Sequence, residues 1–291
     1  MYNMNFRYEC FERYISSCNI CDVDVSWKEI IKIFTRRMGV KNIYIPFFDF
    51  NVNTMCTLKC KNCDQGMPYL NEKNIYTFDM LKEYIDALLA KVQYIYQISV
   101  IGGEPLINKD LDKIIDYCAA SEKIGSIILV TNGTIFPSKE ILRTLKNKKI
   151  IVGISWYPLL DTSKRERLID YLEINDINYH VRRDDWLDFG DWHLNRNYDK
   201  AILQRTFESC FLKNCIQYNK GILYRCAKQY TLRNCKIASP LTYESVDVMA
   251  LKDKKEFSKI IKKFYSLRTL SACNYCNQEK DRKVIPIGEQ L

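Results

Sequence analysis

The stretch that decides the fold is residues 43–63, which read IYIPFFDFNVNTMCTLKCKNC. Its first part, residues 43–50, is rich in isoleucine and phenylalanine and has the length of a buried strand. The remainder has loop composition and carries Cys56, Cys60 and Cys63 in the spacing C-x3-C-x2-C. Thiolates are soft ligands that suit iron–sulfur clusters or zinc. The stretch therefore predicts a strand that runs into a metal-binding loop.

Downstream of this stretch, strand-like and helix-like segments alternate. Apolar strands are expected at residues 94–101, 126–131, 150–156 and 177–182. Helices with one apolar face are expected between them, with starts at Thr77, Asn108, Ser138 and about residue 163, and Gly125 is expected to end the second. This alternation predicts parallel strands joined by crossover helices, either as an open doubly wound sheet or as a barrel. Both architectures place their chemistry at the carboxyl ends of the strands.

The pattern divides the chain into three expected units. Residues 1–42 form an N-terminal helical extension with a helix at 26–39, and residues 43–195 form the strand–helix core. Residues 196–291 lack the alternation and form a small second unit organised by metal rather than by a large core. Six cysteines gather in that unit: Cys210, Cys215, Cys226, Cys235, Cys273 and Cys276.

Composition limits the function classes. The 291 residues include 13 cysteines and carry a net charge of +9. No signal-peptide pattern and no apolar run of the roughly 18 residues that cross a membrane are found, which predicts a cytoplasmic protein without a membrane partner. In a reducing compartment so many cysteines indicate metal binding or catalysis. The charge fits either an anionic substrate or a solvated lysine-rich surface, and nucleic acid is not expected as a partner.

The motif at residues 56–63, CTLKCKNC, resembles the cysteine signature of radical S-adenosylmethionine (SAM) enzymes. Two further motifs follow in the order of that family: GGEP at residues 102–105, and TNG at residues 131–133. The resemblance covers roughly residues 43–185. Asn62 departs from the family, in which many members carry an aromatic residue before the third cysteine. The adenine contact then falls to another side chain, such as Met67 or Tyr69.

The resemblance implies an α/β fold, a partial (β/α)6 TIM-like barrel. It implies a 4Fe–4S cluster held by Cys56, Cys60 and Cys63, with SAM bound at the fourth iron. In the family, one electron splits SAM and the resulting 5′-deoxyadenosyl radical abstracts hydrogen from the substrate. An electron donor such as flavodoxin or ferredoxin is therefore an implied partner. The implied cofactor-binding residues are Gly102, Gly103, Glu104, Pro105, Asn132, Ser155 and Arg182.

Two physical arguments accompany these assignments. Glycines at 102 and 103 let the backbone approach a ligand closely, and Glu104 offers acceptors for an ammonium group. Arg182 and Arg183 follow the fifth expected strand, where a guanidinium suits the cofactor carboxylate or a substrate phosphate as well as it suits a surface pair. The remaining substrate-side candidates are Tyr157 and the aromatic stretch Trp186–Trp192, which is either a lid or a packing loop.

The second cysteine group resembles the twitch or SPASM extensions of the family. Its G-x4-C step from Gly221 to Cys226 and its later C-x2-C pair, Cys273 and Cys276, imply one auxiliary 4Fe–4S cluster. Cys215 is preferred to Cys210 as the remaining ligand. A structural zinc ion is the alternative, because spacing alone does not select the metal.

The combined interpretation is a radical SAM oxidoreductase that dehydrogenates a polar small molecule, such as a sugar or nucleotide sugar. The auxiliary cluster then accepts the second electron, a layout that the radical alcohol dehydrogenases of aminoglycoside pathways share. The first alternative is a radical SAM enzyme that modifies a peptide, as in the maturation of ribosomally made peptides or sulfatases. The second alternative is a zinc-binding protein without catalysis.

Overall fold

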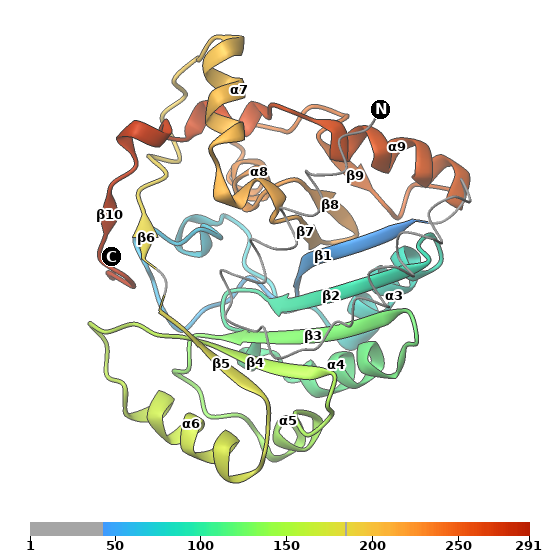
Figure 1. The fold of residues 1–291 in the computed structure, drawn as a ribbon, viewed down its shortest axis with the longest axis vertical. Helices are drawn as coiled ribbons and strands as arrows, with labels where there is room; N and C mark the ends of the chain where they lie inside the picture. The colour runs from blue at the N-terminus through green and yellow to red at the C-terminus, as the bar shows by residue number, and fades with distance from the viewer. Residues whose placement is uncertain (1–42, 184) are drawn as a thin grey trace, which may run out of the picture.

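The computed structural model describes residues 43–183 and 185–291 (Figure 1). The predicted extension at residues 1–42, with its helix and with Cys10, Cys18 and Cys21, lies outside the described residues. Within the described ranges, no helix has the length and apolar character needed to cross a membrane.

Five parallel strands form the centre of the molecule, and they stand in the sheet in their order along the chain. They are β1 (Tyr44–Asn51), β2 (Tyr94–Ile101), β3 (Ile124–Thr131), β4 (Ile150–Ser155) and β5 (Tyr179–Arg182). A doubly wound sheet reverses its strand order at a switch point. The run from β1 to β5 has no reversal. The sequence allows a doubly wound sheet or a barrel, and this strand order is that of a barrel.

Helices connect these strands and cover one face of the sheet with apolar side chains. They are α3 (Phe78–Leu89), α4 (Leu111–Ala120), α5 (Lys139–Thr144) and α6 (Ser163–Ile174). The expected caps Thr77 and Ser138 are confirmed, because their hydroxyl oxygens accept hydrogen bonds from the backbone N–H groups of Met80 and Ile141. In Figure 1, α4, α5 and α6 lie along the lower side of the strands.

Two expected helix boundaries are wrong. The N-cap of α4 is Asp110, because the Asn108 side chain is used elsewhere: its amide donates to the carbonyls of Val52 and Tyr76, both at 2.9 Å. Gly125 does not end α4, which stops at Ala120, but lies inside β3.

The sheet continues into the C-terminal part of the chain. Strand β7 pairs parallel with β1 at the edge opposite β2, and β8 and β9 extend the sheet with antiparallel pairing. Their bounds are Gln217–Asn219, Ile222–Tyr224 and Ser245–Asp247. The sixth parallel strand, β7, thus lies beside β1 instead of beside β5. The strands on both sides of the predicted boundary at residue 195 belong to one eight-stranded sheet.

Three more helices complete the C-terminal part: α7 (Lys200–Glu208), α8 (Ala227–Asn234) and α9 (Lys254–Ser266). The apolar face of α9, with Phe257, Ile261 and Phe264, is buried in the same core as the barrel helices. A separate two-stranded ribbon joins β6 (Trp186–Leu187) to β10 (Val284–Ile285), so the aromatic stretch begins as a strand.

Candidate functional site

The first cysteine group lies on the loop that follows β1, at the carboxyl edge of the sheet. Cys56, Cys60 and Cys63 are all free thiols, and Cys60 is 6% exposed. Burial raises the pKa of the Cys56 thiol to about 11 and raises the pKa values of the other two. The charge of Cys60 adds to the pKa rise of both Cys56 and Cys63, so the three sulfurs lie close enough to interact.

Amide groups point at two of these sulfurs. Cys56 Sγ accepts from the Leu58 backbone N–H at 3.4 Å and from Asn132 Nδ2 at 3.6 Å, and Cys60 Sγ accepts from Gln290 Nε2 at 3.3 Å. Donors in this position stabilise negative charge on sulfur. These donors oppose the pKa rise that burial causes and so favour the thiolate, the form in which cysteine binds metal.

Gly102 and Gly103 pack against the cysteine loop itself. A Cβ atom on Gly102 would lie 2.5 Å from the carbonyl oxygen of Asn53, and one on Gly103 would lie 2.1 Å from that of Met55. The Asn53 side chain fastens the same contact, because its Oδ1 accepts from the backbone N–H of Met55 at 3.0 Å. The close approach that these glycines permit is thus to the backbone that carries Cys56.

Glu104 is fully buried and ties the ends of β2 and β3 together. Its carboxylate accepts from the Thr131 hydroxyl at 2.8 Å, the Asn132 backbone N–H at 2.7 Å and the Leu106 backbone N–H at 3.1 Å. Burial raises its pKa to about 7, although these hydrogen bonds oppose the rise. Since a carboxylate has about four acceptor sites, three donors leave one for a ligand. Pro105 follows as the first residue of a 3-10 turn and is buried.

Asn132 reaches both the first cysteine and a residue that sequence reasoning missed. Its Nδ2 donates to Thr57 Oγ1 at 3.0 Å as well as to Cys56. Its backbone carbonyl accepts from Nε of Arg165 at 2.8 Å, and the Arg165 side chain is completely buried. Arg165 lies in the first turn of α6. Because arginine is usually exposed, no local pattern would have revealed its burial.

The other expected cofactor residues lie at the ends of β4 and β5. Ser155 pairs in register with Arg182, and the Trp156 backbone N–H donates to the Arg182 carbonyl at 2.9 Å. The Arg182 side chain is exposed, and its charge opposes the rise in the pKa of Asp49, which burial and Asp64 bring to about 7. An acidic side chain, Asp49, and a basic one, Arg182, therefore lie near each other toward the carboxyl ends of β1 and β5.

The aromatic candidates are held by packing contacts. Tyr157 packs edge-on against Trp186, with ring centroids 5.9 Å apart, and the Arg165 guanidinium lies 5.2 Å from the Tyr157 ring centroid. The Arg183 guanidinium lies 5.0 Å from the ring centroid of Trp156. Met67 is buried and Tyr69 donates to the carbonyl of Lys61 at 2.6 Å.

Four cysteines of the second group come together from three segments. Cys210 precedes a 3-10 turn, Cys226 is the N-cap of α8, and Cys273 and Cys276 lie in and directly after another 3-10 turn. Burial raises the pKa of Cys210 to about 11 and of Cys226 to about 12, and the neighbouring charge of Cys276 contributes to both rises. The pKa of Cys273 rises through burial and through the charges of the other three.

Cys215 and Cys235 lie apart from these four. After burial, the charge that most raises the pKa of Cys215 is Asp49 of β1, and Cys210 comes next. Cys235 Sγ donates to the carbonyl of Tyr69 at 3.1 Å. Cys210, and not Cys215, is among the charges that raise the pKa of Cys226, and this favours Cys210 as its partner.

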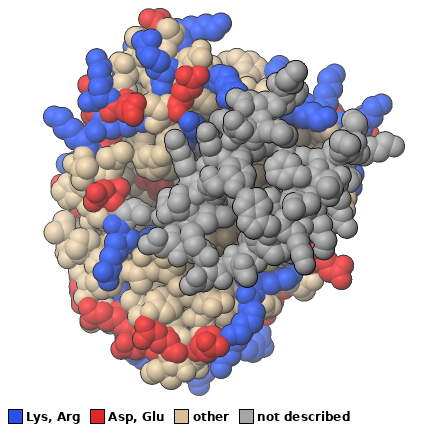
Figure 2. All heavy atoms as spheres, viewed as in Figure 1, with Lys and Arg blue, Asp and Glu red and all other residues tan. Residues whose placement is uncertain are grey.

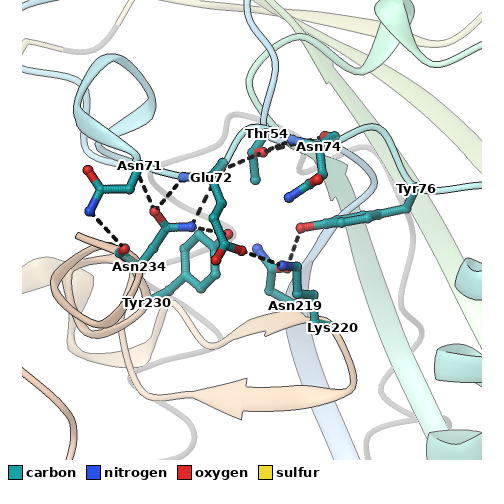
Figure 3. A network of polar contacts seen from close by, with 9 residues as sticks. All are labelled: Thr54, Asn71, Glu72, Asn74, Tyr76, Asn219, Lys220, Tyr230 and Asn234. Atoms are coloured by element: carbon teal, nitrogen blue, oxygen red, sulfur yellow. Dashed lines mark hydrogen bonds and ion pairs between the residues drawn. The ribbon is translucent and has the colours of Figure 1, made fainter. Parts of the chain in front are cut away.

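A polar network connects the two cysteine groups (Figure 3). At the end of α8, Asn234 Oδ1 accepts from the backbone N–H groups of Asn71 and Glu72 at 2.9 and 3.2 Å. Lys220, in the β7–β8 turn, pairs with the Glu72 carboxylate at 3.2 Å. Since α8 begins at Cys226, the helix joins the second group to the segment that follows Cys63.

The donor sets fit iron–sulfur clusters. In the described part of the chain, no three His, Cys, Asp or Glu side chains are close enough to hold a single metal ion. A four-iron cluster places each thiolate on a different iron, so its ligands are spread more widely than those of one ion. Three cysteines on one loop match a cluster with one iron left for another ligand.

Charge on the visible face is distributed along the edges (Figure 2). Lysine and arginine side chains gather along the upper edge, where Figure 1 places α7 and α9, and acidic side chains gather along the lower edge near α6. The chain has a net charge of +9, but the described residues of this face do not gather their basic side chains into a single patch.

Comparisons with known proteins agree with this site. Residues 50–180 match the model of the radical SAM superfamily. A GTP 3′,8-cyclase of Aquifex aeolicus is 32% identical over 121 residues, which are 40% of this chain and 36% of that protein. A GTP 3′,8-cyclase of Helicobacter pylori is 28% identical over 131 residues, which are 44% of this chain and 38% of that protein. The chain thus matches less than two fifths of the length of these curated relatives.

Solved structures with a similar arrangement have low sequence identity. BtrN in complex with AdoMet and 2-DOIA has a TM-score of 0.49 and 16% identity, covering 86% of this chain and 100% of that one. Streptococcus suis SuiB bound to S-adenosylmethionine has a TM-score of 0.42 and 16% identity, covering 60% and 44%. With the cysteine loop, the GGEP turn and the family match in agreement, residues 50–180 are identified as a radical SAM domain.

Proposed function

We propose that this protein is a radical SAM enzyme that oxidises a polar small molecule. The observation that carries the proposal is the set of amide N–H groups aimed at Cys56 and Cys60, beside the buried Glu104. Such donors suit cysteines that carry negative charge as cluster ligands. Neutral thiols that are buried and bind no metal do not require such donors.

The roles of the residues follow from their positions. Cys56, Cys60 and Cys63 would hold three irons of a 4Fe–4S cluster. When bound, the cluster and SAM supply one-electron cleavage of SAM to a 5′-deoxyadenosyl radical that abstracts hydrogen from the substrate. Glu104 keeps one acceptor site for the methionine ammonium. Asn132 holds the loop at Cys56.

The second cysteine group supports an oxidative outcome. Cys210, Cys226, Cys273 and Cys276 would hold an auxiliary 4Fe–4S cluster, because their thiols interact with one another. Abstraction of a hydrogen atom from an alcohol leaves a carbon radical, which becomes a carbonyl by releasing a proton to solvent and one electron to an acceptor. An auxiliary cluster held by these four cysteines would be that acceptor. The charged side chains of Asp49 and Arg182, at the same edge of the sheet, support a polar substrate.

Rearrangement of a purine nucleotide is the second candidate function. The curated relatives named GTP 3′,8-cyclase are its support, and the matched region is only part of each. Peptide modification remains the third candidate. Incubating reduced enzyme and SAM with polyols, GTP or peptides, and following substrate loss and 5′-deoxyadenosine by mass spectrometry, separates the three.

Iron content and SAM cleavage test the class of enzyme. Anaerobically reconstituted protein should hold about eight irons per chain in two four-iron clusters. The Cys56/Cys60/Cys63 triple alanine variant should hold roughly half of that iron and form no 5′-deoxyadenosine after dithionite reduction. Cys118→Ala, which removes a buried free thiol of α4, is the matched control and should retain both properties.

Three outcomes would contradict the proposal. Protein that binds zinc without sulfide is not an iron–sulfur enzyme. A reconstituted cluster whose electron paramagnetic resonance (EPR) spectrum does not change on SAM addition lacks the open iron. Loss of all iron in the triple variant excludes two separate clusters.

A further inference from the structure

The last residues of the chain pair with the first cysteine loop. We call residues 288–291 the C-terminal strap. Its Glu289 carbonyl accepts from the Lys61 backbone N–H at 2.8 Å, and the Leu291 N–H donates to the Lys59 carbonyl at 2.9 Å. These bonds form an antiparallel bridge between Cys60 and Gln290. The strap is therefore a strand partner of the loop that carries the middle cysteine.

The Gln290 side chain is fixed at both ends of its amide. Its Oε1 accepts from the Lys59 backbone N–H at 2.7 Å, and its Nε2 donates to the Gly288 carbonyl at 2.6 Å and to Cys60 Sγ at 3.3 Å. These contacts leave the amide one orientation, in which an N–H group points at the sulfur.

The start of the strap is held against the barrel. A Cβ atom on Gly288 would lie 2.5 Å from Cδ1 of the Tyr157 ring, and Gly288 has a φ of 73°, a backbone conformation that favours glycine. Upstream, β10 pairs with β6. The strap thus crosses from this ribbon over Tyr157 to the cysteine loop, and its position does not depend on the Gln290 side chain alone.

A hydrogen bond to a cluster-ligating sulfur affects the two oxidation states of the cluster unequally. The reduced cluster carries one more negative charge, so an N–H donor stabilises it more than the oxidised cluster. The effect is strengthened at Cys60, which is buried, because the surrounding dielectric constant is low. The Gln290 donor therefore makes the cluster easier to reduce.

We propose that Gln290 is a positioning residue of the catalytic cluster, which raises the reduction potential of that cluster through its hydrogen bond to Cys60. The inference rests on the proposed function, because it requires a cluster at Cys56, Cys60 and Cys63. It differs from the roles of Glu104 and Asn132, which come from the barrel. Through Gln290, the strap would therefore affect the reduction of the cluster, the step that starts the reaction.

Two substitutions of Gln290 and one neighbouring control test this role. Gln290→Leu removes both the donor and the acceptor of the amide. Gln290→Lys also loses the acceptor for Lys59 but keeps an N–H donor within reach of the sulfur. Glu289→Gln breaks the exposed ion pair with Lys61 and leaves the strap backbone unchanged.

The measurement is an EPR-monitored redox titration of reconstituted protein without SAM, together with iron content. A net hydrogen-bond energy of about 1 kcal/mol corresponds to a roughly fivefold change in an equilibrium ratio. At a fixed potential, Gln290→Leu should therefore lower the reduced-to-oxidised ratio of the cluster about fivefold, or about 40 mV at 59 mV per tenfold for one electron. Gln290→Lys and Glu289→Gln should stay at or above the wild-type ratio. The auxiliary cluster should titrate unchanged in all three.

Several results would overturn the inference while leaving the proposed function intact. These are an unchanged ratio in Gln290→Leu, an equal fall in Gln290→Lys, or an equal shift of both clusters. Loss of cluster iron in Gln290→Leu but not in Gln290→Lys would support a donor role, and equal loss in both would assign Gln290 to loop folding instead. Absence of any cluster at Cys56 in wild-type protein would instead contradict the proposed function itself.

Discussion

The two cysteine groups of this protein are built in opposite ways. The first occupies one loop of eight residues, and its shape is set by backbone contacts with Gly102, Gly103 and the strap. The second is spread over residues 210–276 and is assembled from the ends of helices and turns. A local site therefore depends on what packs against its backbone, whereas a distributed site depends on the positions of whole elements.

The largest expected effect tests which cysteines form the distributed group. Cys210→Ala should lose about half of the eight irons expected from two four-iron clusters, while Cys215→Ala should retain them. The reason is that the pKa values of Cys226 and Cys273 respond to the charge of Cys210, whereas the charge that most raises the pKa of Cys215 is Asp49. Iron and sulfide analysis after anaerobic reconstitution provides the measurement. Iron loss in Cys215→Ala but not in Cys210→Ala would identify Cys215 as the ligand instead.

A second variant tests whether backbone packing forms the local site. Gly103→Ala places a Cβ atom 2.1 Å from the Met55 carbonyl oxygen, so the loop has to move. We expect destabilisation of about 3 kcal/mol, at the upper end for overpacking, and loss of iron from the first group only. Gly153→Ala is the control, because the atom nearest to its Cβ would be a methyl carbon of Ile128 at 3.3 Å. Urea denaturation and iron analysis compare the two, and equal effects would refute the packing argument.

The third variant tests the connection between the groups. Asn234→Ala removes hydrogen bonds to the backbone N–H groups of Asn71 and Glu72 (Figure 3). We expect a loss of about 1–2 kcal/mol, as for hydrogen bonds left unmade at a partly exposed site. Gln204→Ala, which breaks an exposed bond to Glu208 in α7, should change the free energy of unfolding much less. If both variants unfold at the same urea concentration, Asn234 is not a structural link.

The smallest expected effect is a pH-dependent change in stability at Asp110, the N-cap of α4. Asp110 accepts from the Phe78 backbone N–H at 3.0 Å and pairs with Lys113, and these interactions lower its carboxyl pKa. A lowered folded-state pKa stabilises the fold above the unfolded value of about 3.9, and this contribution disappears as pH falls through the folded value. Asp110→Asn should therefore cost about 0.5 kcal/mol at pH 7 and nothing near pH 2. Urea titrations at both pH values measure this, and a difference that persists in acid would exclude a charge effect.

The sequence predicts those parts of the molecule whose residues are neighbours in the chain. The cysteine loop at 56–63 and β2 are examples, since periodicity and spacing act locally. Asn108 shows where local rules fail, because its side chain donates to the carbonyls of Val52, just after β1, and Tyr76, just before α3, and does not cap the helix. Gln290 could not be predicted from sequence, because its contact with Cys60 joins residues 230 positions apart and matches no motif. Spacing alone ranks Cys215 above Cys210 as a ligand, and spacing does not say which way a thiol points.

Helix α8 also fixes a length. It begins at Cys226, its Thr231 hydroxyl donates to the Gln65 carbonyl at 3.0 Å, and its end is fastened to Asn71. A helix of eight residues is about 12 Å long. The helix therefore sets the separation between Cys226 and the segment that follows Cys63. Under the proposed function, a substrate that meets both cysteine groups has to fit that separation.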